Sequence, residues 1–222
     1  MKECFWDLVI FDLDGTLLDT IDDLGHAVNH SLALAGYPQH TMAEYRQMVG
    51  NGVRNLVTRA LPEDLRTETE IDARLEDFLS YYKSHIDVHT HPYEGMADLV
   101  RELHEAGAAV AVASNKFQEG TERLVAEFFP GIPFCAVLGN RPGTPLKPDT
   151  AVVRTCIEAS GMSGDARVVM VGDSAVDMKT AANAGIHSIG VTWGFRGRDE
   201  LAASGACEIV DTADALRCCL YR

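Results

Sequence analysis

The sequence predicts an α/β protein: a Rossmann-like, doubly wound parallel sheet with a helical bundle inserted after its first strand. From about residue 90 onward, short apolar runs alternate with helical patterns, as they do in units that build parallel sheets. Four helical patterns with no strand between them span roughly 20–85, as in a small helical bundle. We therefore expect an α/β core at 1–17 and 90–222, and a helical domain at 18–89.

The first strand is the apolar run Leu8–Phe11, which ends abruptly at acidic residues and a glycine. A helical pattern begins at Ile21 and ends before Gly36. Thr41 and Glu44 have capping-box spacing, which predicts a short helix beginning there. Two further helices are expected, at about 53–61 and 71–82.

The core elements are expected in alternation along the rest of the chain. Proline is common in the first turn of a helix. Because of Pro148, a helix is expected to begin at Lys147-Pro148-Asp149. The expected elements are a helix at 95–106, a strand at 108–113, a helix at 118–128, a strand at 134–138, a helix from 147 to about 160, a strand at 167–171, a helix at 175–184, a strand at 187–191, a helix at 198–204, a strand at 207–210 and a final helix.

Composition and charge limit the classes of partner. The 222 residues carry a net charge of −14, which argues against nucleic acid or an anionic membrane as partner. No apolar stretch is long enough to span a membrane, and no secretory segment is seen, so we expect a cytoplasmic protein. The six cysteines form no CxxC pair, and the adjacent Cys218 and Cys219 are interpreted as incidental rather than redox-active. The sequence leaves open whether the protein is a monomer or a homodimer.

Polar side chains follow three of the expected strands. Asp12 and Asp14 follow the first, Ser114-Asn115 follows another, and Asp173 follows a third. In open α/β sheets, ligands bind beyond the carboxyl ends of the strands. We therefore expect these groups to meet in one crevice.

The donors in this crevice suit phosphoryl transfer. Asp12, Asp14 and Asp173 offer hard oxygen ligands of the kind that bind Mg²⁺. Lys147 adds positive charge, and the Ser114 hydroxyl and nearby backbone N–H groups, including that of Asn115, can donate to a phosphoryl oxygen. One carboxylate can attack phosphorus while another transfers protons.

Four ordered motifs resemble those of the haloacid dehalogenase-like hydrolase superfamily, over essentially the whole chain. They are Phe11-Asp12-Leu13-Asp14-Gly15-Thr16, Ala113-Ser114-Asn115-Lys116, Lys147-Pro148-Asp149 and Gly172-Asp173-Ser174-Ala175-Val176-Asp177-Met178.

The resemblance implies a role for each motif residue. It implies Asp12 as nucleophile and Asp14 as general acid and base, with Ser114 and Lys147 contacting phosphate. It implies Mg²⁺ held by Asp12, Asp173 and the backbone carbonyl of Asp14. Asp177 would support this set by orienting Lys147 or a metal-bound water. The helical insertion would be the cap of the family.

Two further segments resemble phosphoglycolate phosphatases. They are Val49-Gly50-Asn51-Gly52-Val53-Arg54 and Val191-Thr192-Trp193-Gly194-Phe195. The expected enzyme is thus a Mg²⁺-dependent phosphatase of small phosphate esters. A phosphomutase of β-phosphoglucomutase type remains open, as do a pyrophosphatase, a 5′-nucleotidase and a non-catalytic relative. Thr16 favours the phosphatase, because sugar-phosphate mutases of this type often carry an aliphatic residue there, and it is a candidate substrate contact.

The helical domain contributes two groups of interest. Arg54 follows a glycine loop and could pair with the carboxylate of a small substrate. The alternative is a solvated surface arginine. His85, His89 and His91 are interpreted as an exposed hinge rather than a zinc site, which would need a fourth ligand and a fixed geometry.

Overall fold

The computed structural model describes residues 4–162 and 164–221, and its chain forms two compact units. One unit comprises Met1–Leu18 and Pro92–Arg222, and the other comprises Asp19–His91. The chain passes between them within two short paired strands, β2 (Leu18–Asp19) and β3 (His91–Pro92), which the sequence did not predict.

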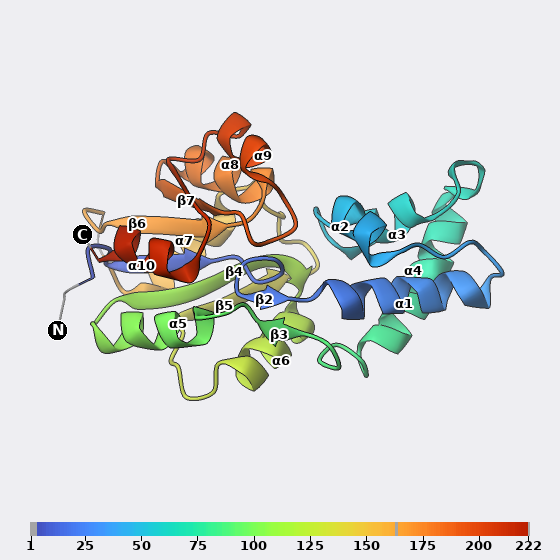
Figure 1. Cartoon of the computed structure of the whole chain (residues 1–222), viewed down its shortest axis with the longest axis horizontal. Coiled ribbons are helices and arrows are strands. Elements are labelled where there is room, and N and C mark those ends of the chain that lie inside the picture. Colours follow the sequence, from blue (N-terminus) through green and yellow to red (C-terminus); the bar gives the residue numbers. More distant parts are fainter. Residues whose placement is uncertain (1–3, 163, 222) are drawn as a thin grey trace. The chain divides into compact units, whose positions relative to one another are not determined.

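The first unit is built on a six-stranded parallel sheet with helices flanking it (Figure 1). Its strand order is β5-β4-β1-β6-β7-β8, so the chain builds outward on one side of β1 and then returns to build on the other. This confirms the doubly wound α/β core expected from the alternating pattern. The strands are β1 (Leu8–Phe11), β4 (Ala109–Phe117), β5 (Ala136–Asn140), β6 (Val168–Gly172), β7 (His187–Val191) and β8 (Glu208–Val210).

The central strands are apolar because both faces of the sheet are covered. Every residue of β1 and of β6 is buried. One cluster packs Leu8 and Ile10 of β1 against Val153 and Cys156 of a flanking helix. The helices of this unit are α5 (Met96–Glu105), α6 (Gln118–Phe128), α7 (Ala151–Ser160), α8 (Ala175–Ala184), α9 (Arg198–Ala203) and α10 (Ala213–Leu220).

Two predicted boundaries in this unit differ from the structure by four residues each. Strand β4 continues through Ser114-Asn115-Lys116 to Phe117, with a register shift against β5 after Ala113. Helix α7 begins at Ala151, so Pro148 precedes the helix instead of lying in its first turn. The Asp149 carboxylate accepts from the Ala151 N–H at 2.8 Å, which satisfies one of the donors at the start of α7.

The second unit is the predicted run of helices. The capping box of α2 is confirmed: the Thr41 hydroxyl accepts from the Glu44 N–H, and the Glu44 carboxylate accepts from the Thr41 N–H. The elements are α1 (Ile21–Leu34), α2 (Met42–Met48), α3 (Val53–Ala60), a 3₁₀ turn (Glu63–Leu65) and α4 (Glu68–Tyr82). Among the described residues, no helix of either unit is long and apolar enough to cross a membrane.

Candidate active site

The candidate site lies where the strand order reverses, at the carboxyl ends of β1 and β6. Phe11 is in register with Val171, so Asp12 and Asp173 leave the sheet close together. Phe11 is also in register with Val112 of β4, which brings Ser114 to the same edge. This position is the usual ligand-binding crevice of a doubly wound sheet.

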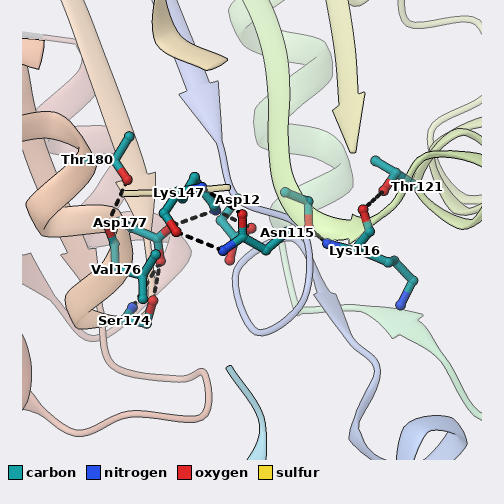
Figure 2. A network of polar contacts seen from close by, with 10 residues as sticks. Asp12, Asn115, Lys116, Thr121, Lys147, Ser174, Val176, Asp177 and Thr180 are labelled. Carbon is teal, nitrogen blue, oxygen red and sulfur yellow. Dashed lines mark hydrogen bonds and ion pairs between the residues drawn. The ribbon is translucent and has the colours of Figure 1, made fainter. Parts of the chain in front are cut away.

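Lys147 lies at the centre of the charged groups (Figure 2). Its Nζ donates to Asp12 Oδ1 at 2.8 Å and to Asp177 Oδ1 at 2.6 Å. The three side chains are 3%, 11% and 0% exposed respectively. The expected link between Asp177 and Lys147 is therefore a direct ion pair in this structure.

Asp177 is oriented from its other side by the start of α8. Its Oδ2 accepts from the Ser174 hydroxyl at 2.6 Å and from the Ser174 N–H at 3.2 Å. Gly172, the last residue of β6, is needed beside it, because a Cβ there would lie 2.3 Å from Asp177 Cβ.

Asp173 is held by the loop that follows β7. Its Oδ2 accepts from the Phe195 N–H at 2.7 Å. The backbone packs so closely here that a Cβ on Gly15 would lie 2.4 Å from the same oxygen, and one on Gly194 would lie 2.5 Å from it. Gly15 also has φ +89°, a conformation that side chains disfavour.

Burial and mutual repulsion shift the pKa values of these acids. Burial raises the pKa of Asp12 to about 7, with Asp177 and Asp14 adding to the rise and Lys147 opposing it. Burial also raises the pKa of Asp173 well above its usual value, reinforced by Asp12 and Asp177. Burial acts to lower the pKa of Lys147, but the Asp12 and Asp177 carboxylates outweigh it and raise that pKa.

These acids offer the kind of oxygen atoms that bind a cation. One carboxylate oxygen each from Asp12, Asp173 and Asp177 can be chosen so that all lie within 4.8 Å of one another. Lys147 compensates only one of these three buried charges, so a dication fits both the charge and the hard-oxygen donor set. The Asp14 carboxylate is not in this group, and its expected metal contact was through the backbone carbonyl.

Asp14 is paired with Lys116, whose side chain was not among the predicted site residues. Lys116 Nζ lies 3.0 Å from Asp14 Oδ1, and its side chain is only 1% exposed. Alternation along β4 could have revealed it, because Lys116 stands two residues after Ser114 and shares its face. The position of Asp14 is therefore defined by a second ion pair, in which the lysine is buried and the carboxylate partly exposed.

Asn115 uses its side chain on the protein itself. Its Nδ2 donates to the Lys147 carbonyl at 3.1 Å, and its Oδ1 accepts from the Lys147 N–H at 2.9 Å. It thus holds the loop that carries Lys147. Ser114 is nearly buried, and its Oγ accepts from the Lys116 N–H at 3.2 Å.

Thr16 and Arg54 lie in different surroundings. Thr16 is fully buried, and its carbonyl accepts from Trp193 Nε1 at 3.1 Å. Arg54 belongs to the helical unit, where its guanidinium lies 2.5 Å from both Glu68 and Asp72. The substrate contacts expected of both residues stay predictions.

A family model described as haloacid dehalogenase-like hydrolase matches residues 9–191, which include every motif residue of this site. The chain belongs to this family. The resemblance drawn from the four motifs is thereby confirmed.

Relatives of the haloacid dehalogenase-like chain carry a consistent name. A phosphoglycolate phosphatase of Agrobacterium fabrum is 37% identical over 191 residues, with 85% of this chain and 81% of the relative covered. One from Vibrio cholerae is 32% identical, with 88% of each covered. A crystal structure of a candidate phosphoglycolate phosphatase from Lactobacillus delbrueckii subsp. bulgaricus has a TM-score of 0.91 and 35% identity, and covers 100% of this chain and 99% of that one. These likenesses support a phosphatase.

Proposed function

We propose that this haloacid dehalogenase-like phosphatase is a Mg²⁺-dependent phosphomonoester hydrolase that acts through an aspartyl-phosphate on a small, phosphoglycolate-like ester. The observation that carries the proposal is the ion pair between Lys147 and Asp12 inside a cluster of buried acids. It supplies a carboxylate for attack in a site whose charge attracts a cation and, through it, a phosphate.

The reaction would follow from the positions of the acids. An oxygen of Asp12 attacks phosphorus, and the bond from phosphorus to the ester oxygen breaks while Asp14 gives that oxygen a proton. Asp14 then takes a proton from water, whose oxygen attacks phosphorus and releases Asp12 with inorganic phosphate. Lys147 and the Ser114 hydroxyl would bind phosphoryl oxygens, with the backbone N–H of Asn115.

Mg²⁺ would be held by Asp12, Asp173 and the Asp14 carbonyl, and would neutralise charge on the transferring phosphoryl group. Asp177 would act through Lys147, which it contacts, rather than on substrate. Phe195 fixes Asp173 by its backbone N–H, so the carboxylate is positioned before any ligand binds.

Replacing the nucleophile tests the reaction. We expect Asp12→Asn to lower Mg²⁺-dependent phosphate release from 2-phosphoglycolate by at least about 10³-fold, because an amide does not form the covalent intermediate. Asp22→Asn, in an exposed acid of α1, is the control. Undiminished turnover by Asp12→Asn would sink the assignment. Phosphate release from substrate alone, without a sugar bisphosphate, separates the hydrolase from a phosphomutase.

The proposed substrate class places a carboxylate beside the phosphate, and we propose that Arg54 of the helical cap recognises it. Because Arg54 pairs with Glu68 and Asp72 in this structure, substrate would compete with those acids. Arg54→Ala should raise KM for 2-phosphoglycolate by about 10-fold or more and leave that for ethyl phosphate unchanged. Arg101→Ala, an exposed arginine of α5, is the control. An equal effect on both esters would contradict the role.

A further inference from the structure

Two histidines of the helical unit face each other beside a buried acid. The ring centroids of His26 and His89 are 5.1 Å apart, with their planes tilted by 54°. One atom from each ring and one carboxylate oxygen of Asp23 all lie within 4.8 Å of one another. His26 lies on α1 and His89 on the segment before β3, so the fold joins residues distant in sequence. This group shares no residue with the acids of the candidate active site.

Asp23 fixes the backbone on which one of these rings stands. It is 2% exposed, and its Oδ2 accepts from the Thr90 N–H and the Thr90 hydroxyl, both at 2.8 Å. The His89 N–H lies 3.0 Å from both carboxylate oxygens. His26 follows Asp23 by three residues on α1, so both share one helix face. Asp23 therefore holds the backbone of His89 in place beside the helix face that carries His26.

The ring nitrogens of His26 and His89 are uncommitted. Among the described residues, none makes a hydrogen bond to these nitrogens. Both side chains are exposed, so an ion from solvent can reach them. Other histidines of this unit differ: His85 Nδ1 lies 2.9 Å from the Tyr81 carbonyl, and His40 Nε2 lies 2.8 Å from the Ala60 carbonyl. Among the residues that the structure describes, Asp23 Oδ1 has only the shared His89 N–H as a partner, so a lone pair is available.

We propose that His26, His89 and Asp23 form a second metal site, for a divalent transition metal of the Zn²⁺ class. Two imidazoles and a carboxylate are a donor set that suits Zn²⁺, with water completing the tetrahedron. Ligand atoms around tetrahedral Zn²⁺ lie about 3.3 Å apart, so the exposed rings need small rotations to close on the ion. The oxygen-only set at Asp12 instead suits Mg²⁺. The inference is independent of the proposed phosphatase reaction.

Zinc titration of the untagged 222-residue chain tests the site. The protein is first freed of metal with a chelator, then held in excess Mg²⁺ so that the acidic cluster is occupied, and titrated calorimetrically with ZnCl₂. We expect one Zn²⁺ per chain to bind with a dissociation constant below about 100 µM. His26→Ala and His89→Ala should each weaken binding by at least about 10-fold, and the double variant should lose it.

His30→Ala is the matched control, because His30 lies one turn further along α1 but stacks on Tyr81. It should bind zinc as the unaltered chain does. Both altered histidines are exposed, so folding should be preserved, and a circular dichroism spectrum checks this. Long-range ¹H–¹⁵N spectra should show zinc-dependent shifts of the His26 and His89 ring nitrogens.

Two results would overturn the proposal. One is zinc uptake that is unchanged in the His26→Ala/His89→Ala variant, since the zinc would then lie elsewhere, including at the acidic cluster. The other is wild-type binding weaker than about 100 µM.

Discussion

At the scale of single residues, Lys147 is the group on which the buried charges of the site depend. It is the amine paired with both Asp12 and Asp177, and all three side chains are almost excluded from solvent. Removing one partner of a buried ion pair leaves the other charge uncompensated, which is costly. The lysine therefore has a structural role that does not depend on any substrate.

Lys147→Met should expose this role in the absence of divalent metal. We expect the free energy of unfolding to fall by about 3–5 kcal/mol, because two carboxylates lose their buried partner. Urea unfolding at neutral pH measures it, with Lys179→Met, at an exposed position of α8, as control. Adding Asp177→Asn should recover part of the loss, since one buried charge is then removed. A loss below about 1 kcal/mol would show that solvent reaches these acids freely.

At the scale of elements, the first turn of α8 connects secondary structure to the chemistry. Ser174 donates to Asp177, and Asp177 accepts from Lys147, so one helix start helps to position the lysine. The same kind of cap begins α2 in the helical unit, where the Glu44 carboxylate accepts from the Thr41 hydroxyl at 2.8 Å and from the Thr41 N–H at 2.7 Å. The two caps can therefore be compared directly.

Ser174→Ala and Thr41→Ala should have similar effects on stability and different effects on activity. We expect each to lower the free energy of unfolding by about 1 kcal/mol, the usual loss for a helix cap. Only Ser174→Ala should also reduce kcat, by about 10-fold, because Asp177 becomes free to turn away from Lys147. Steady-state kinetics measures kcat of both variants, and chemical denaturation measures their free energy of unfolding. Equal kcat values would mean that the lysine is positioned without this cap.

The order of the core helices and strands was predictable because each of them has the hydrophobic periodicity typical of its type. The boundary errors came from contacts that a single sequence does not reveal. Polar residues at 114–116 suggested the end of a strand, but Lys116 can continue β4 because Asp14 neutralises it. Pro148 suggested a helix start, but Asn115 holds the Lys147 backbone in a loop. The acids of the site were predictable because they follow strands that the sequence reveals.

At the scale of the whole molecule, the net charge of −14 makes acid pH a sensitive probe of stability. Asp7 stands out among the exposed carboxylates. Arg167 donates to it through Nε, Nη2 and the backbone N–H, at 3.1, 2.8 and 2.8 Å. These hydrogen bonds lower the pKa of Asp7 from its usual 3.8 to about 2, and those from the Arg167 side chain have the largest effect. They join the residue before β1 to the residue before β6.

Asp7→Asn should therefore destabilise the protein in a pH-dependent way. Because the folded-state pKa is depressed, the stabilisation is present above about pH 4 and is lost as pH falls toward 2. The carboxylate is more than a third exposed, so we expect a difference of at most about 1 kcal/mol at pH 7. Chemical denaturation at neutral and acid pH should show that the difference in free energy of unfolding between the variant and the unaltered protein becomes smaller in acid. A gap that widens in acid would contradict the ion pair as its origin.

The pairing of β2 with β3 has a consequence for how such a protein can be rebuilt. The last residue of the sheet unit before the helical unit is Leu18, and the first after it is Pro92. These two residues lie on neighbouring strands although 73 residues separate them in the chain. Removing that unit would leave its two chain ends on paired strands, and exchanging it leaves the strand order of the six-stranded sheet unaltered. The helical unit can thus be exchanged as a whole, while Asp12, Lys147 and Asp173 remain on the sheet unit that positions them.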